Sequence, residues 1–472
     1  MTDVEGIVDT AKYLRHVRPI DPEEIFEYVE GEPHPAVVRQ TLREHAFDLG
    51  LHEREDGTFV PIEDDAIDPT FRGVERFPEQ YVRRFEELLV DRYGPDWAGG
   101  DSGDRLRKRI DELKIAYFSD ESVTYDAETA LAYALYHLPD YYAAIQYALD
   151  ELGRAGLLSR RLRILDIGAG TGGPALGIHD YLPAESLVEY HAVEPSAAAD
   201  VFEAMVDPTR PGFATTIHRE TAEAFDPNGE YDIVVFGNVL SELDDPVRVV
   251  ERYLGSLKPD GTVLAISPAE ERTATRLRAI ERDLLERNDG VTVYAPTLRL
   301  WPGESPSDRG WTFTRKPELE PPPFQRRLEE NAPKRPDGSP ERGGRYTKPV
   351  VQFAYLLLRT DGKRAIEYDP DSDRVGKMAE TDRHVTERID ITALKLSPNL
   401  ADDGHPLFKI SDGSEAIDHY AVLTERSALN DVLLDAPYGS LLAFENALVL
   451  WNDDEGAYNL VVDGETVVDR VA

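Results

Sequence analysis

Hydrophobic and polar residues follow a succession of patterns along the chain, and the first pattern predicts a small helical module. Residues 5–17, 21–30 and 34–50 carry apolar side chains at helical spacing, and in the last range Val38 and Leu42 share one face. Residues 51–62 contain two short apolar runs around Asp56-Gly57, which favours a tight hairpin. Three helices and a hairpin predict a winged-helix-like module over residues 1–65. A helical region is expected to follow over 66–157.

From residue 158 the pattern changes to apolar strands that alternate with amphipathic helices. We expect strands at 163–168, 189–194, 231–237, 261–267, 291–296 and 350–360. We expect helices near 173–182, 196–206, 246–257 and 271–287. Such alternation is typical of a mostly parallel sheet covered by helices on both faces. The fold class is therefore α/β, with a Rossmann-like doubly wound sheet over 158–362 and an insertion at 297–348.

Beyond residue 362 the strands become short and regular. They are expected at 389–396, 407–410, 420–425, 442–451 and 458–469. Short strands separated by turn residues are typical of a small β-barrel, which includes the oligonucleotide-binding (OB) kind. We therefore expect a β-rich, OB-like domain over 363–472. A fold alone does not assign it a ligand.

A glycine-rich stretch, 163-RILDIGAGTGGPALG-177, follows the first strand of the sheet and opens a helix. Gly168 permits a sharp turn, Gly170 lets the backbone approach a ligand, and Gly172 lets the helix pack closely. Asp166 precedes the first glycine by two residues. A carboxylate there disfavours a pyrophosphate but suits the ammonium group of S-adenosylmethionine. The form D-x-G-x-G-x-G thus favours the methyl donor over a dinucleotide.

Other polar residues stand where the next strands end. Glu194 ends the second strand, where a carboxylate can accept both ribose hydroxyls of the donor. Glu223, in 221-TAEAF-225, is a candidate for flanking the adenine. Asn238 follows the strand at 231–237, and we take it as a cofactor-binding residue and as the one candidate for a catalytic role. Methyl transfer needs mainly in-line placement of donor and acceptor, so no further catalytic residue is assigned.

Composition changes the picture in two ways. The chain has 91 acidic against 52 basic residues, a formal charge of −39, which is the composition of a halophilic protein. In molar salt the Debye length is only about 3 Å and counterion release is weak, so net charge does not exclude an RNA partner that binds through shape and stacking. The chain also has no cysteine. This excludes disulfides, thiolate metal sites and thiol nucleophiles.

In its second half the insertion has more basic than acidic residues, whereas the chain around it is acidic. We consider four of its cations as candidates for contact with RNA: Arg326, Arg327, Lys334 and Arg335. A disordered connector is the alternative interpretation of so proline-rich a segment. Aromatic residues at 301, 311 and 313 precede these cations and fit a nucleotide-facing lid.

Several stretches together resemble one known family. They are 139-PDYYAAIQYALDEL-152, 165-LDIGAGTGGPAL-176, 233-IVVFGNVLSEL-243, 293-VYAPTLRLW-301, 311-WTF-313, 324-FQRR-327 and 347-TKPVVQFAYLLL-358. In this order they resemble the mitochondrial ribosomal small-subunit (Rsm-type) methyltransferase-like family, whose homologues also occur in bacteria and archaea. The resemblance implies a class I methyltransferase fold, S-adenosylmethionine as cofactor, and small-subunit ribosomal RNA as partner. It leaves open whether the protein methylates rRNA or assists subunit assembly without catalysis.

One departure from that family concerns an iron–sulfur cluster. Relatives carry cysteines in patterns such as P-C-P-H and W-C-H-F, whereas this chain has Thr297 and Thr312 at the matching positions. Threonine cannot replace a thiolate ligand, so no iron–sulfur cluster is expected. The insertion must then be ordered by packing, by salt or by RNA.

Two alternative functions remain open. One is a methyltransferase for a small molecule, which would need a closed pocket rather than a charged surface. The other is a nucleic-acid-binding regulator that acts through the winged helix. We expect no metal site, because the histidines show no zinc-type spacing. With no long apolar run and no signal-peptide core, we also expect no membrane association, a cytoplasmic location and a monomer.

Overall fold

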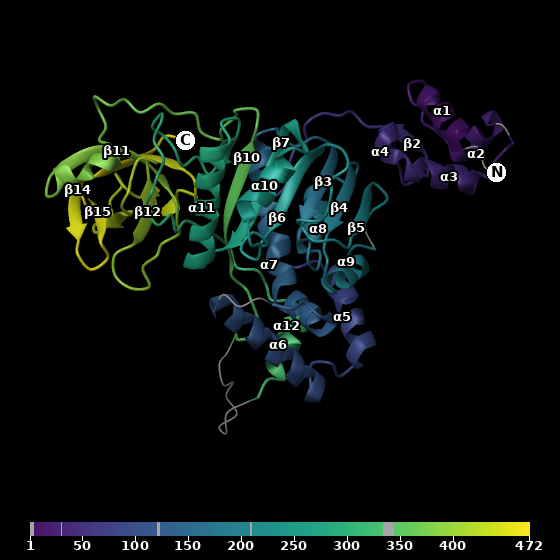
Figure 1. The fold of residues 1–472 in the computed structure, drawn as a ribbon, viewed down its shortest axis with the longest axis horizontal. Coiled ribbons are helices and arrows are strands. Elements are labelled where there is room, and N and C mark those ends of the chain that lie inside the picture. Colours follow the sequence, from purple (N-terminus) through teal and green to yellow (C-terminus); the bar gives the residue numbers. More distant parts are fainter. Residues whose placement is uncertain (1–3, 30, 120–122, 208–209, 334–343) are drawn as a thin grey trace. The chain divides into compact units, whose positions relative to one another are not determined.

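A computed structural model describes residues 4–29, 31–119, 123–207, 210–333 and 344–472. The chain divides into two compact units. The first contains residues 1–237, 256–258 and 317–349, and the second contains residues 238–255, 259–316 and 350–472. The insertion is thus divided, because its first part belongs to the second unit and its last part to the first. Each unit is described by itself below, with the element labels of Figure 1.

The first unit begins with the winged-helix-like module. It contains α1 (Val4–Leu14), α2 (Pro22–Ile25), η1 (Phe26–Tyr28), α3 (Pro35–Glu44), α4 (Ala46–Leu49), β1 (Leu51–Glu53) and β2 (Phe59–Pro61). Strands β1 and β2 pair antiparallel around the expected turn. The buried side chains Ile7, Val38, Leu42 and Phe59 belong to its core. The module therefore buries the apolar face that the helical spacing predicts.

Three longer helices follow: α5 (Glu79–Tyr93), α6 (Gly100–Ser119) and α7 (Ala127–Arg154). Pro139 lies inside α7 and has no N–H, so the Leu135 carbonyl loses its helical partner. Gln325, on α12 (Pro323–Glu330), donates its Nε2–H to this carbonyl at 3.0 Å and to that of Tyr136 at 3.1 Å. The end of the insertion thus compensates for the proline and is anchored on α7.

The parallel part of the sheet also belongs to the first unit. It consists of β3 (Arg161–Ile167), β4 (Leu187–Val193), β5 (Phe213–His218) and β6 (Tyr231–Gly237). The strands lie in the order β5-β4-β3-β6 and all run parallel. Helices α8 (Gly173–Tyr181) and α9 (Ala198–Val206) accompany them (Figure 1). Helix α7 packs against α8 so closely that a Cβ at Gly177 would lie 2.3 Å from Ile145.

The second unit carries the antiparallel part of the α/β sheet. Its elements are α10 (Pro246–Leu254), β7 (Leu257–Pro268, whose first two residues belong to the first unit), α11 (Glu271–Arg287), β8 (Thr292–Ala295), β9 (Thr314–Lys316) and β10 (Val351–Arg359). Strand β10 pairs antiparallel with β7, β8 and β9. Because β7, β8 and β9 each run antiparallel to β10, these three share one direction. The sheet is thus mixed through β10 alone among these strands, which agrees with the mostly parallel sheet that the sequence predicts.

The C-terminal residues form a small barrel in the second unit, as the strand pattern predicts. Its elements are η2 (Met378–His384), β11 (Arg388–Lys395), β12 (Leu407–Ser411), β13 (His419–Leu423), α13 (Val432–Asp435), β14 (Leu441–Asn452), β15 (Ala457–Val462) and β16 (Val467–Arg470). The order β11-β12-β13-β15-β14 closes because β14 pairs back with β11, and β16 pairs with β14. Five strands thus enclose a core that includes Phe408, Phe444 and Leu460.

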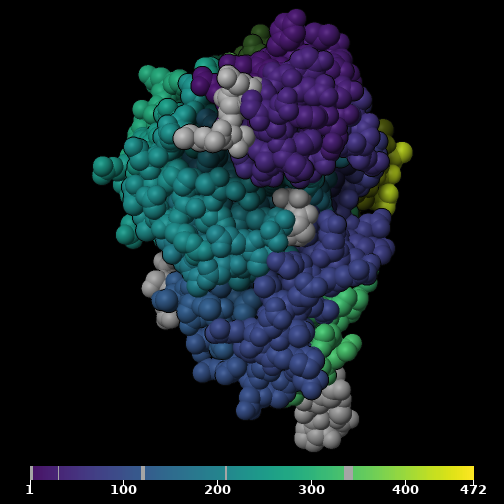
Figure 2. Space-filling model, turned by 90° about the vertical axis from the view of Figure 1, so that its right-hand side faces the viewer, coloured from purple at the N-terminus to yellow at the C-terminus, as the bar shows by residue number. Residues whose placement is uncertain are grey.

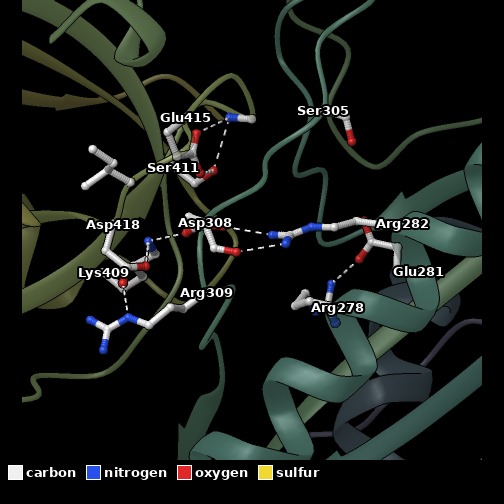
Figure 3. A network of polar contacts seen from close by, with 12 residues as sticks. Arg278, Glu281, Arg282, Ser305, Asp308, Arg309, Lys409, Ser411, Glu415 and Asp418 are labelled. Carbon is white, nitrogen blue, oxygen red and sulfur yellow. Dashed lines mark hydrogen bonds and ion pairs between the residues drawn. The ribbon is translucent and has the colours of Figure 1, made fainter. Parts of the chain in front are cut away.

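The barrel holds the first part of the insertion. Leu298 and Leu300 pack with Leu394, Leu396 and Leu441. Beside them, the buried Lys409 ammonium pairs with Asp308 and with Asp418, the second at 2.7 Å (Figure 3). Arg309 of the insertion pairs with Asp418, and Arg282 of α11 with Asp308. Packing and buried ion pairs therefore order this segment in the absence of cysteine.

Candidate functional site

The glycine loop follows β3 and takes the backbone conformation that only glycine adopts without strain. The φ angles of Gly168, Gly170 and Gly172 are 69°, 56° and 91°. The N–H groups of Gly168 and Ala169 both donate to the carbonyl of Val193, at 2.9 and 3.2 Å. The loop is therefore fixed against the end of β4, and Gly172 leads directly into α8.

Glu194 lies at this loop, as the sequence predicts. One of its carboxylate oxygens accepts the Gly170 N–H at 2.9 Å, and the other accepts the N–H of Ser196, also at 2.9 Å. The residue is 8% exposed. The Ser196 hydroxyl also donates to the second oxygen, at 2.5 Å. A carboxylate offers about four acceptor sites, so these three bonds orient the side chain and leave about one acceptor for a hydroxyl group of a ligand.

Asp166 ends in a different environment. It is fully buried, and Oδ2 accepts the hydroxyl of Tyr190 at 2.6 Å, whereas Oδ1 has no hydrogen-bond partner among the described residues. Burial raises the pKa of Asp166 to about 7; the Tyr190 hydrogen bond opposes the rise, and the nearby Glu194 charge adds to it. A buried carboxylate with an unpaired oxygen is costly, and a cation or donor nearby would relieve that cost.

Helix α7 carries a column of rings beside the loop. Tyr125, just before the helix, accepts the Ala197 N–H at 3.3 Å through its carbonyl. Ring centroids then follow at 5.4 Å (Tyr125–Tyr133), 4.9 Å (Tyr133–His137) and 5.0 Å (His137–Tyr141). The column ends at α8, because a Cβ on Gly173 would lie 3.0 Å from Tyr141 Cβ. It thus runs from the residues after Glu194 to the helix that the glycine loop opens.

Polar groups accompany this column. Lys348 lies 2.8 Å from Asp140 Oδ2 and 3.0 Å from Nδ1 of His137, and its N–H donates to Gln325 at 3.1 Å. Burial lowers the pKa of His137 to about 4, and the Lys348 charge adds to this shift, so its imidazole is neutral at pH 7. Asp140 Oδ1 and the Tyr141 hydroxyl are buried without hydrogen-bond partners among the described residues. The column therefore offers unpaired polar atoms next to the glycine loop.

Sequence reasoning did not select Asp140, His137 or Lys348. The tyrosines of this helix have the helical spacing that is typical of core residues, and Tyr141 is indeed only 9% exposed. No signal within the helix indicates that Lys348, more than two hundred residues later, pairs with it. The stretches that contain Asp140 and Lys348 do, however, both belong to the family resemblance, and that was the one usable signal.

Two further predicted residues are Asn238 and Glu223. In the second unit, Asn238 has a φ of 64° and is 6% exposed, and its side-chain oxygen has no partner among the described residues. It lines a small hollow together with Ser241, Thr273 and Arg276. Glu223 lies exposed in the loop that follows β5. Their roles in cofactor binding or catalysis stay predictions.

The four RNA-facing candidates fall into two groups. Arg326 pairs with Glu320 at 2.8 Å and Arg327 with Glu86 at 3.4 Å, and both arginine side chains stay about two-fifths exposed, at 45% and 40%. Lys334 and Arg335 lie outside the described residues. In the winged helix, Arg39 and Arg43 both pair with Glu53.

No described helix is long and apolar enough to cross a membrane. Nor do the described His, Asp and Glu residues gather in a group of three or more that could hold a metal ion.

Comparison with known families supports the methyltransferase assignment. Residues 165–263 match the methyltransferase domain family. Residues 5–55 and 379–471 match the N-terminal and C-terminal domain models of one family, described as "Domain of unknown function (DUF8157)". No curated protein matches the chain.

Solved structures give distant likenesses. A plantazolicin methyltransferase in complex with S-adenosylhomocysteine is 10% identical, with a TM-score of 0.30 over 60% of this chain and 99% of that chain. A Pyrococcus horikoshii protein proposed to be an RNA methyltransferase is 15% identical, with a TM-score of 0.28 over 46% and 84%. An S-adenosylmethionine-dependent methyltransferase from Clostridium acetobutylicum is 14% identical, with a TM-score of 0.23 over 29% of this chain and 54% of that chain. This chain therefore spans about half the length of the last protein.

Residues 165–263 thus belong to a methyltransferase domain, and the expected α/β fold class and S-adenosylmethionine cofactor are confirmed.

Proposed function

We propose that the protein binds small-subunit ribosomal RNA and uses its S-adenosylmethionine-dependent methyltransferase domain on that RNA during subunit assembly. The observation that carries the proposal is a cluster of cations and aromatic rings beside α7, in the same unit as the glycine loop. Its members are Lys114, Tyr136, Arg345, Tyr346 and Lys348, and it is called the cation–aromatic cluster below.

The cluster combines charge with flat apolar surface. Lys114 Nζ lies 4.0 Å from the centre of the Tyr136 ring and 5.8 Å from that of Tyr346. The Lys348 ammonium lies 5.5 Å from the Tyr136 ring, and the Arg345 guanidinium 5.7 Å from the Tyr346 ring. RNA recognition uses stacking on aromatic side chains together with contacts to phosphates, and stacking persists at high salt.

Burial and the neighbouring cations both lower the pKa of Lys114. Burial lowers the pKa of Lys114 to about 8; the Asp111 carboxylate opposes the shift, and Arg345 and Lys348 increase it. Three cations held this close repel one another, even in a chain of net charge −39, unless nearby anions compensate them. Asp111 and Asp140 do so in part. An RNA phosphate would complete the compensation.

Bound at the glycine loop, S-adenosylmethionine would supply an activated methyl group. Transfer forms a bond from an acceptor nitrogen or oxygen to the methyl carbon, breaks the carbon–sulfur bond and releases S-adenosylhomocysteine, while the acceptor's proton passes to a base or to water. Glu194 would orient the donor's ribose through the acceptor site that Gly170 and Ser196 leave unused. The ring column on α7 would hold the acceptor in line, which is the main requirement of this chemistry.

A direct test combines donor and RNA binding. Calorimetry at high salt should show binding of S-adenosylhomocysteine, and a gel-shift assay should show binding of transcribed small-subunit rRNA in preference to duplex DNA. Modification mapping in a deletion strain then separates the two modes of action. One missing methyl group establishes catalysis, whereas an intact pattern with defective subunits establishes assembly without methylation.

The result that overturns the proposal is equally clear. If the protein binds S-adenosylhomocysteine but neither rRNA nor assembling small subunits, the domain serves a small-molecule acceptor. If duplex DNA is preferred, the winged-helix regulator is the better interpretation.

A further inference from the structure

A second hollow lies away from the glycine loop, within the first unit. It has a volume of about 850 Å³ and is formed by the end of α5, the loop that follows it, the start of α6 and the end of α12. Figure 2 shows the green atoms of the insertion beside the blue helical region on this side of the molecule. The side chains that matter for its chemistry are Arg92, Tyr93, Arg105, Arg327 and Asn331.

Three guanidinium groups from three helices line this hollow. Arg92 comes from α5, Arg105 from α6, and Arg327 from α12. Asp96 and Asp101 are the two carboxylates of the lining, so its cations outnumber its anions. This is the reverse of the whole chain, in which acidic residues outnumber basic ones by 91 to 52.

The arginines keep most of their donors unused. Arg105 lies 3.4 Å from Glu128, and Arg327 lies 3.4 Å from Glu86 and donates to the Pro95 carbonyl at 3.1 Å. Arg92 makes no ion pair with any residue that the structure describes. A guanidinium has five N–H donors, so each of the three can still bind two oxygens of a phosphate in its fork geometry.

Two of the guanidiniums rest on aromatic rings. Arg327 lies 5.0 Å from the centre of the Trp97 ring, and Arg105 lies 5.7 Å from that of Tyr93. Trp97 is fully buried, so its ring is a fixed support. Planar cations held on rings lose little conformational freedom when they bind a ligand.

We propose that this hollow binds phosphate groups of single-stranded RNA. The volume suits a nucleotide rather than a lone phosphate, because pockets for ligands of that size span about 300–1,000 Å³. Such contacts position RNA without reading its sequence. The inference rests on the proposed association with RNA but not on methyl transfer.

The test uses the full-length protein, a fluorescent oligouridylate and the double variant Arg92→Gln/Arg105→Gln. Affinity should fall at least about tenfold, and the slope of log affinity against log salt should become shallower by about 0.7 per lost contact. The matched control is Arg83→Gln, because Arg83 is an exposed α5 residue that does not line the hollow. This control should bind as the wild type does.

Further measurements keep the outcomes distinct. Thermal unfolding and calorimetry with S-adenosylhomocysteine should give the same result for the double variant and the wild type. With a 4-thiouridine probe, ultraviolet cross-links should fall on peptides that contain residues 92–105 or 327–331.

The inference is overturned if the double variant binds oligouridylate as tightly as the wild type, or if cross-links fall elsewhere. It is also overturned if the wild type does not bind oligouridylate and inorganic phosphate alone binds at the arginines. A wild type that binds oligouridylate through these arginines but methylates nothing leaves this inference standing and defeats only the catalytic part of the proposed function.

Discussion

Two buried polar clusters, one in each unit, differ in how completely their groups are paired. In the barrel, Lys409 has both Asp308 and Asp418 as partners, and Glu415 accepts from the Ser411 hydroxyl and the Gly413 N–H (Figure 3). Around α7 and the glycine loop, by contrast, Asp166 Oδ1 and the Tyr141 hydroxyl have no hydrogen-bond partner among the described residues, and Asp140 Oδ1 has only His137 Nδ1 at 3.8 Å.

This difference in pairing indicates a structural role for one cluster and a ligand-binding role for the other. A paired network gives a defined geometry and needs nothing from outside, so the barrel cluster serves to hold the insertion. Unpaired buried atoms cost free energy that the native state recovers only when a ligand completes them. The contrast therefore indicates the first unit, not the barrel, as the place where small ligands act.

The largest expected effect is on the paired cluster. Lys409→Met leaves Asp308 and Asp418 buried without their cation, which should lower the free energy of unfolding by about 3–5 kcal/mol. Chemical denaturation at constant salt measures the change. Lys363→Met is the control, because its ion pair with Asp361 is exposed and contributes at most about 1 kcal/mol. A loss below that of the control would show that the barrel cluster is not a paired unit.

The next effect is a pH dependence of stability. Burial, with the nearby Asp308 charge, raises the pKa of Glu415 to about 8, so the folded protein keeps a proton that the unfolded chain has already lost above its ordinary pKa of 4.5. The contribution of Glu415 to stability should therefore fall as pH rises from about 4.5 to 8 and level off above.

A control must distinguish the titration of Glu415 from that of Asp166. Asp166, with a pKa raised to about 7, acts in the same direction but has lost its proton by pH 8. Between pH 7 and 8 the lowered pKa values of Lys114 and Lys395, both about 8, contribute with the opposite sign. The Glu415 contribution is therefore the difference in slope between the wild type and Glu415→Gln, and the stability of the variant should fall less as pH rises. A slope that the substitution leaves unchanged in unfolding curves taken across this range contradicts the assignment.

A smaller effect is expected at the donor site. Glu194→Ala removes the partner of the Gly170 N–H and the proposed ribose acceptor, so affinity for S-adenosylhomocysteine should fall about ten- to a hundredfold, or about 1.4–2.8 kcal/mol. Calorimetry gives the number. Glu223→Ala is the informative companion, because the exposed Glu223 was also expected to bind the donor. Equal losses would support both assignments, and no loss for Glu194→Ala would refute the first.

The smallest effect concerns the support of α7. Gln325→Leu removes the donors to the two carbonyls at the proline and should lower the free energy of unfolding by about 1–2 kcal/mol. Gln40→Leu, at an exposed helical position, should change it by less than about 0.5 kcal/mol. If the two variants unfold alike, Gln325 does not support the helix, and the position of Lys348 must have another cause.

The sequence predicts those features that short-range chemistry determines. The glycine turn needs a left-handed backbone, Glu194 ends the next parallel strand, and alternating apolar residues make the barrel strands, so each follows from its neighbours. The direction of β10 does not follow from its neighbours in sequence, because an apolar strand has the same residue pattern in either direction.

Pairs of residues far apart in the sequence could not be predicted, for a different reason. The contacts of Lys348 with Asp140, and of Gln325 with Leu135, join residues about two hundred positions apart. Nothing in either local pattern indicates the other partner. The pairing of Lys409 with Asp308 is hidden in the same way, because a chain with so many carboxylates offers many equivalent partners.

Gly413 gives the barrel a constraint of its own. A Cβ there would lie 2.0 Å from the carbonyl oxygen of Leu298, so the loop tip touches the insertion's backbone without any side chain between them. A barrel from another protein, with a side chain in place of Gly413, would clash with this backbone and could not pack against the insertion. We therefore expect the barrel to be exchanged between proteins only together with the first part of the insertion. A truncation that removes one of these two segments should leave the other without its packing partner.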